Sequence, residues 1–123
     1  YMVSEAAFSL MKPDVLLLNT ARGACVDTKA LIKALVAKRI AGYAADVYEK
    51  EKGIFFKDNS DQGIHDDHLK TLLSLENVLL TPHQAYVTKE ALSNIAEITF
   101  NNLDCWVKGE TCKNELGYET LVL

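Results

Sequence analysis

The sequence has little cysteine, no excess of positive charge and no long apolar run. Its three cysteines are an odd number without a Cys-x-x-Cys pair, which is typical of a reducing compartment rather than of a disulfide-stabilised domain. Thirteen lysines and arginines stand against seventeen aspartates and glutamates, and the net charge of −4 argues against a nucleic-acid partner. The longest run of large aliphatic residues, 15–18, is far shorter than the roughly 20 residues of a membrane span. We therefore expect a cytoplasmic protein with no nucleic-acid or membrane partner.

The glycines are also few, and they lack one particular spacing. None of the six takes part in a Gly-x-Gly-x-x-Gly pattern, so the fingerprint of a dinucleotide-binding loop is absent from these residues. The length of 123 residues, 49% of them hydrophobic, suits one globular domain and is too short for a two-domain enzyme. Because the sequence begins at Tyr1, we expect it to be a piece of a longer protein.

Short apolar runs alternate with helical patterns along the chain. Residues 14–19, 40–47 and 78–80 are apolar runs too short for helices, and the first is typical of a strand buried on both faces of a parallel sheet. Ser4 and Asp27 are expected N-caps of helices that run to about Met11 and Lys38. A longer amphipathic helix is expected from Thr88 to about residue 108, and residues 48–66 between the strands lack any steady period. This alternation predicts a doubly wound α/β sheet.

In such a sheet, ligands bind outside the carboxyl ends of the strands. Each of the three predicted strand ends carries a polar residue of a different kind: Arg22, Glu51 and His83. An arginine fork binds a carboxylate, a histidine transfers a proton near neutral pH, and a carboxylate on its other nitrogen orients the ring. Asp46 is a candidate anchor for a polar group of a cofactor. Together these residues predict a site for a small acid.

Simpler interpretations compete with this one. Taken singly, Arg22 fits a surface ion pair, His83 fits an exposed loop residue, and Glu51 lies in a charged run that is solvated by default. Residues 65–68 contain possible metal ligands, but a polar helix start explains them better, and we predict no metal site. The pair Phe55-Phe56 is interpreted as a hydrophobic plug in the long loop.

Three ordered motifs nevertheless resemble a known family. They are Asn19-Thr20-Ala21-Arg22-Gly23, Asp46-Val47-Tyr48-Glu49-Lys50-Glu51 and Pro82-His83-Gln84-Ala85-Tyr86. From about Ser4 to Glu115, the chain is similar to the C-terminal part of the D-isomer-specific 2-hydroxyacid dehydrogenases, and most of all to the fermentative D-lactate dehydrogenases. The resemblance implies the C-terminal half of a Rossmann-type doubly wound parallel sheet followed by a long helix. Residues 1–87 would be the second half of an NAD-binding domain, and residues 88–123 a helix and tail that return to an absent substrate domain.

The resemblance also implies a role for each matched residue. Arg22 would bind the carboxylate of pyruvate and polarise its keto group, and His83 would donate the proton to the keto oxygen. Glu51 would keep His83 protonated and oriented while NADH transfers a hydride, which gives D-lactate. Asp46 would bind the carboxamide of the nicotinamide, with the backbone around Thr20 and Ala21 nearby. Tyr86 would lie at the substrate pocket.

Other functions remain open at this stage. One alternative is an NADH-sensing corepressor on the same fold, because such proteins keep the three charged residue types. Another is a stand-alone module that dimerises through the apolar stripe of the last helix. As part of a dehydrogenase, the segment would be inactive by itself and would belong to a homo-oligomer at full length. Residues 117–123 fall outside the resemblance and have no predicted role.

Overall fold

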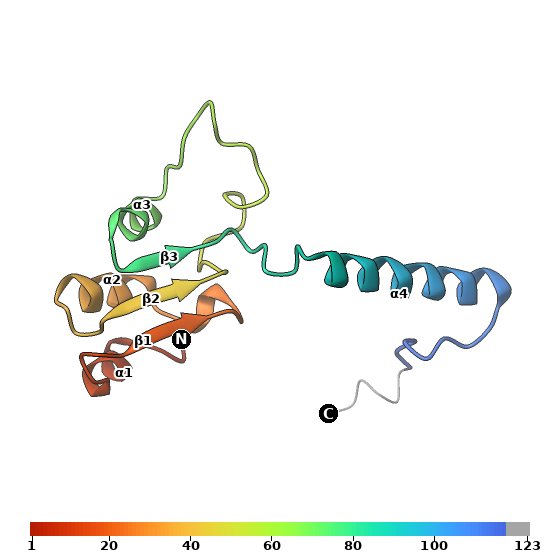
Figure 1. The fold of residues 1–123 in the computed structure, drawn as a ribbon, viewed down its shortest axis with the longest axis horizontal. Helices are drawn as coiled ribbons and strands as arrows, with labels where there is room; N and C mark the ends of the chain where they lie inside the picture. Colours follow the sequence, from red (N-terminus) through yellow and green to blue (C-terminus); the bar gives the residue numbers. More distant parts are fainter. Residues whose placement is uncertain (118–123) are drawn as a thin grey trace. The chain divides into compact units, whose positions relative to one another are not determined.

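The computed structural model describes residues 1–117, and the chain forms two compact units (Figure 1). The first unit comprises Tyr1–Ala85 and contains the sheet, and the second begins at Tyr86. The predicted tail extends into residues 118–123, which lie outside the described part of the chain.

The first unit contains a parallel sheet of three strands in the order β1 (Leu16–Asn19), β2 (Gly42–Ala45), β3 (Val78–Leu80). Leu18 in β1 is in register with Ala44 in β2, and Ala44 is in register with Leu79 in β3. Figure 1 shows helical segments between consecutive strands, which confirms the predicted α/β architecture. The elements of this unit are α1 (Glu5–Leu10), β1 (Leu16–Asn19), a short 3-10 helix (Gly23–Cys25), α2 (Thr28–Val36), β2 (Gly42–Ala45), α3 (Asp67–Ser74) and β3 (Val78–Leu80).

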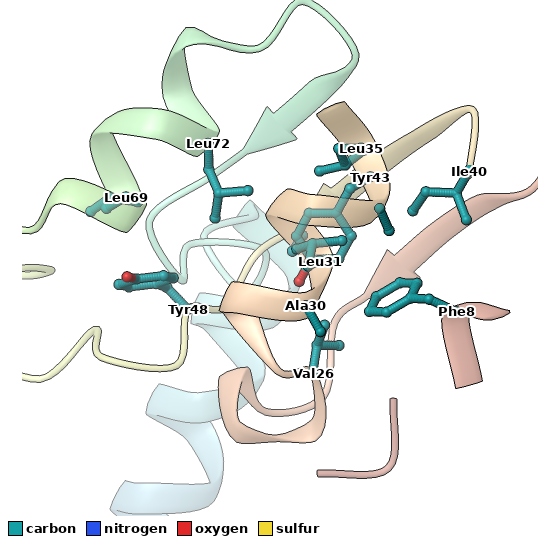
Figure 2. Packing of buried hydrophobic residues seen from close by; sticks show 12 residues of the cluster. Phe8, Val26, Ala30, Leu31, Leu35, Ile40, Tyr43, Tyr48, Leu69 and Leu72 are labelled. Atoms are coloured by element: carbon teal, nitrogen blue, oxygen red, sulfur yellow. The ribbon is translucent and has the colours of Figure 1, made fainter. Parts of the chain in front are cut away.

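The core of this unit lies between one face of the sheet and the helices. Figure 2 shows Phe8 from α1, Leu31 from α2 and Leu72 from α3 turned toward Tyr43 of β2. Apolar side chains recur three and four residues apart along α2, so that a single stripe of the helix is buried. Burial of this stripe, rather than helix propensity, stabilises so short a helix.

Side-chain caps mark where two helices of the first unit begin. The carboxylate of Asp27 accepts a hydrogen bond from the Ala30 N–H and starts α2, as the sequence predicts. Asp66 does the same for α3 through the Leu69 N–H, which confirms that residues 65–68 are a helix start. Ser4 is the N-cap residue of α1, which confirms the predicted helix start, but its hydroxyl does not make the expected capping hydrogen bond.

The opposite face of the sheet differs from the prediction. Leu16 and Leu18 of β1 and Leu79 of β3 are exposed, whereas Leu17 and Asn19 of β1 are turned toward the helices. The expectation that β1 is buried on both faces is therefore wrong for this chain. The physical reason is that α1, α2 and α3 contribute their buried residues to one core cluster, and nothing in residues 1–85 covers these leucines.

The second unit consists mainly of α4 (Lys89–Lys108), the longest helix of the described chain. Thr88 caps its first turn by accepting a hydrogen bond from the Ala91 N–H at 3.1 Å. Gly109 ends it in the left-handed conformation, with a φ of 67°, as expected for a glycine at this position. None of the α4 side chains is buried. Within residues 1–117, no helix is both long and apolar enough to cross a bilayer.

Two adjacent leucines of α3 provide a test of the core. Leu72 is 1% exposed and Leu73 is 53% exposed. We expect Leu72→Ala to lower the free energy of unfolding by about 2 to 5 kcal/mol, because it leaves a cavity, and Leu73→Ala to lower it by under about 1 kcal/mol. Chemical denaturation of the two variants measures the difference. Equal losses would contradict the described packing of α3.

Candidate functional site

The carboxyl ends of the three parallel strands lie at one edge of the sheet, and each continues into a loop with a predicted site residue. Arg22 follows β1, Glu51 follows β2 and His83 follows β3. The two elements between these strands, α2 and α3, connect each loop to the opposite end of the next strand. The fold therefore brings to one edge three loops that are up to about 60 residues apart in the sequence.

Glu51 and His83 form a direct pair at this edge. The Nδ1 atom of His83 lies 2.9 Å from Oε1 of Glu51, and the two side chains are 32% and 24% exposed. The other carboxylate oxygen of Glu51 accepts the Tyr48 N–H at 3.0 Å, so the backbone holds the carboxylate in place. An ionised carboxylate only accepts hydrogen bonds, so the pairing places a hydrogen on Nδ1. Within residues 1–117, no group forms a hydrogen bond with Nε2 of His83, so this nitrogen is available to a ligand.

Asp46 holds the loop that carries His83. Its Oδ1 accepts hydrogen bonds from the Thr81 hydroxyl at 2.5 Å and the Gln84 N–H at 2.9 Å, and its Oδ2 accepts the Ala85 N–H at 2.9 Å. Between these donors, His83 has a φ of 56°, a left-handed conformation that is uncommon for a residue other than glycine. The three hydrogen bonds compensate for this conformation by joining the loop to the end of β2.

The same hydrogen bonds determine the ionisation of Asp46. Burial of the carboxyl group is the largest single influence and works against ionisation. The hydrogen bonds from Thr81, Ala85 and Gln84 together outweigh burial and hold the pKa of Asp46 below its ordinary value of 3.8. The site therefore contains a buried negative charge at neutral pH.

The loop after β1 is shaped by the buried side chain of Asn19. Its amide nitrogen donates to the Arg22 carbonyl at 2.9 Å, and its amide oxygen accepts the Ala21 N–H at 3.1 Å. The Arg22 side chain is exposed and donates to the Ala21 carbonyl at 2.7 Å. No carboxylate in residues 1–117 forms an ion pair with Arg22, so its charge is free to bind an anion.

Gly23 brings the loop after β1 against the loop after β2. A Cβ atom on Gly23 would lie 2.0 Å from the Tyr48 carbonyl carbon and 2.3 Å from the Glu49 nitrogen, far inside van der Waals contact. Any side chain at position 23 would therefore separate the two backbones. The residue next to Arg22 thus contacts the segment that leads to Glu51.

The other predicted residues have different surroundings. Thr20 and Ala21 are exposed at the end of β1, and Asp46 accepts three hydrogen bonds from protein donors that were not predicted. Tyr86 belongs to the second unit, and its role at a substrate pocket stays a prediction. In the described residues 1–117, no three His, Cys, Asp or Glu side chains are grouped to hold a metal ion.

Sequence reasoning missed one neighbour of His83. Phe55 packs on Tyr48, with ring centroids 6.4 Å apart, and is partly buried as the plug interpretation expects. Phe56 is exposed, and its ring contacts His83 with centroids 5.9 Å apart, so the plug interpretation is wrong for this residue. The sequence of two adjacent phenylalanines does not indicate which of them is buried and which is exposed. Thr81 was also missed, although its place directly after β3 is a usable signal.

The ionisation of Asp46 gives a pH-dependent prediction. We expect Asp46→Asn to lower the free energy of unfolding by about 1 to 3 kcal/mol at pH 7, because an amide cannot accept all three donors. The folded-state pKa lies below 3.8, so the stabilisation by ionised Asp46 is complete above that pH and is lost as the pH falls through the folded value. Denaturation at pH 7 and at pH 3 measures the difference in unfolding free energy between the variant and the unsubstituted protein. This difference should be smaller at pH 3.

The exposed carboxylate of Asp14 provides the matched control. We expect Asp14→Asn to leave stability nearly unchanged at both pH values. A destabilisation by Asp46→Asn that is the same at both pH values would show that ionised Asp46 does not hold the loop.

Comparison with known proteins agrees with the geometry. Residues 1–85 match the model of the family described as D-isomer specific 2-hydroxyacid dehydrogenase, NAD binding domain. The chain is 47% identical over 116 residues both to a D-lactate dehydrogenase of Curvularia clavata and to one of Escherichia coli. Each match covers 94% of this chain, but only 33% of the Curvularia clavata protein and 35% of the Escherichia coli protein. A crystal structure of D-lactate dehydrogenase with NAD+ from Lactobacillus jensenii has a TM-score of 0.87 at 37% identity, covering 94% of this chain and 35% of that one.

These matches cover most of the chain but only part of each relative. The chain spans about a third of the length of the proteins it matches. The family model includes β1, β2, β3 and the loops that carry Arg22, Glu51 and His83. The chain therefore belongs to the D-isomer specific 2-hydroxyacid dehydrogenase family, and the matched residues 1–85 belong to the NAD binding domain of that family.

Proposed function

We propose that this chain is the C-terminal portion of an NAD-dependent D-lactate dehydrogenase, which reduces pyruvate to D-lactate. The observation that carries the proposal is the 2.9 Å contact between His83 and Glu51, at the same sheet edge as the unpaired cation of Arg22. The names of the similar proteins from Curvularia clavata and Escherichia coli support lactate as the product.

His83 is the proton donor in this proposal. Glu51 stabilises the charged imidazolium through Nδ1, so that Nε2 carries the proton that passes to the keto oxygen of the substrate. The half-exposed position of the ring lets a ligand reach Nε2 while the carboxylate stays held by the Tyr48 N–H. A histidine oriented in this way transfers a proton near neutral pH without large movement.

Arg22 is the substrate anchor. Its guanidinium is permanently charged, exposed and without a carboxylate partner in residues 1–117, so it is free to bind the substrate carboxylate through two parallel hydrogen bonds. The same charge draws electron density toward the keto oxygen, where negative charge develops in the transition state. Tyr86 is proposed to line the substrate pocket.

The NAD cofactor fits the residues present at this edge. Oδ2 of Asp46 accepts one hydrogen bond, from Ala85, so it can accept a second from the carboxamide of the nicotinamide. The exposed Thr20 and Ala21 at the end of β1 would lie beside the nicotinamide. When bound, NADH supplies the hydride that adds to C2 of the oxo acid. A Gly-x-Gly-x-x-Gly loop, which cradles the pyrophosphate in such domains, is absent from the 123 residues.

The proposal extends to the organisation of the complete protein. Residues 1–87 would form the second half of its NAD-binding domain, and residues 88–123 would lead back to a substrate domain. The complete protein would be a cytoplasmic homo-oligomer, and this segment alone would be inactive, because it carries the reacting side chains without the pyrophosphate cradle.

Turnover by a His83 variant tests the proton-donor role. In the complete protein that contains this segment, we expect His83→Gln to lower kcat for pyruvate reduction at least about 100-fold, because glutamine donates no proton of comparable acidity. NADH binding, followed by fluorescence titration, should remain within about twofold of the unsubstituted protein, and His65→Gln, outside the site, should leave turnover unchanged. Near-normal turnover by His83→Gln would refute the role. NADH binding by an unsubstituted protein without turnover would support an NADH-sensing binding protein instead.

A substitution of Arg22 tests the substrate-anchor role separately. Lysine keeps the positive charge but loses the planar fork, so we expect Arg22→Lys to raise the KM for pyruvate about 10- to 100-fold, the effect of losing one charge-assisted hydrogen bond. The KM for NADH should change little. Initial rates over a range of pyruvate concentrations measure both constants, and an unchanged KM for pyruvate would show that Arg22 does not bind the substrate.

A further inference from the structure

The long loop after β2 places an exposed aromatic ring on His83. The centroids of the Phe56 and His83 rings are 5.9 Å apart and the ring planes are inclined by 48°. Phe56 is 68% exposed, whereas its neighbour Phe55 packs against the core. Core packing therefore explains Phe55 and leaves Phe56 without a structural role of its own.

The backbone at both partners of this contact is unusual. In residues 1–117, only three residues other than glycine have a positive φ, namely Lys38, Phe56 and His83. Lys38 lies just after α2, where a left-handed residue is ordinary. Phe56, at 61°, and His83, at 56°, are the pair in ring contact. A bulky side chain rarely adopts this conformation, and where it does, the conformation is often associated with a functional site.

The contact complements the hydrogen bond to Glu51. A hydrogen bond through Nδ1 holds one atom of the imidazole and leaves the ring free to tilt about that atom. A neighbouring ring against the imidazole restricts this tilt. The combination of a hydrogen bond and a ring contact thus defines the direction in which Nε2 faces.

We propose that Phe56 is a positioning residue that, with Glu51, orients the His83 ring for proton transfer. The inference rests on the proposed function of His83 as proton donor. Phe56 acts through His83 and not on the substrate, so its removal slows the proton-transfer step without weakening substrate binding.

Kinetics of the complete protein that contains this segment test the positioning role. We expect Phe56→Ala to lower kcat for pyruvate reduction about tenfold, the scale of a small misalignment of a reacting group, with the KM for pyruvate changed less than about twofold. Phe56→Tyr keeps the ring and should restore most of kcat. Lys57→Ala replaces the next exposed residue of the same loop and should leave both constants unchanged. A rise in the KM for pyruvate with kcat unchanged would overturn the inference, as would a Phe56→Tyr variant as slow as Phe56→Ala.

A second measurement needs no turnover. In NMR spectra of the same protein, Phe56→Leu should shift the ring-proton signals of His83, because the ring current of Phe56 is lost, and should leave those of His65 and His68 in place. Unshifted His83 signals would overturn the inference. Absence of turnover in the unsubstituted protein would instead overturn the proposed function, so the two failures are distinguishable.

Discussion

The rest of the site depends on the hydrogen bonds that the carboxylate of Asp46 accepts. This carboxylate lies at the end of β2 and accepts three hydrogen bonds from the segment that follows β3. A left-handed histidine in a short loop is unfavourable by itself, and these hydrogen bonds offset that cost. Because burial alone would disfavour the charge, carboxylate and loop stabilise one another: the loop keeps Asp46 ionised, and ionised Asp46 keeps the loop in place.

Backbone contacts also connect the loop after β1 to the loop after β2. Gly23 approaches Tyr48 so closely that no side chain fits between them, and the Tyr48 N–H binds the carboxylate of Glu51. The Tyr48 side chain extends the connection, because its hydroxyl donates to the Asp66 carboxylate that caps α3. The loops at the three strand ends are therefore connected by hydrogen bonds and close backbone packing.

The sequence was sufficient to predict the strands, the helix starts at Asp27 and Thr88, and the edge of the sheet where polar residues gather. Arg22, Glu51 and His83 were found because apolar runs mark strands and parallel strands end at one edge. The partners of Asp46 were not predictable, because two of its three donors are backbone N–H groups, which nearly every residue has. Phe55 and Phe56 are the same residue type, but Phe55 packs against the core, whereas Phe56 has a positive φ and its ring contacts His83. The exposed leucines of β1 were mispredicted because an apolar run shows that a strand favours burial, not which segment covers it.

The one-sided covering of the sheet has a consequence for the physical behaviour of this unit in solution. Leu16, Leu18 and Leu79 form an apolar surface on the face away from the core cluster. Each square ångström of such surface removed from water contributes roughly 25 cal/mol of favourable free energy, which offsets part of the entropy cost of association. Any segment that covers these leucines would therefore stabilise the folded unit, because binding to the folded form alone shifts the folding equilibrium by mass action.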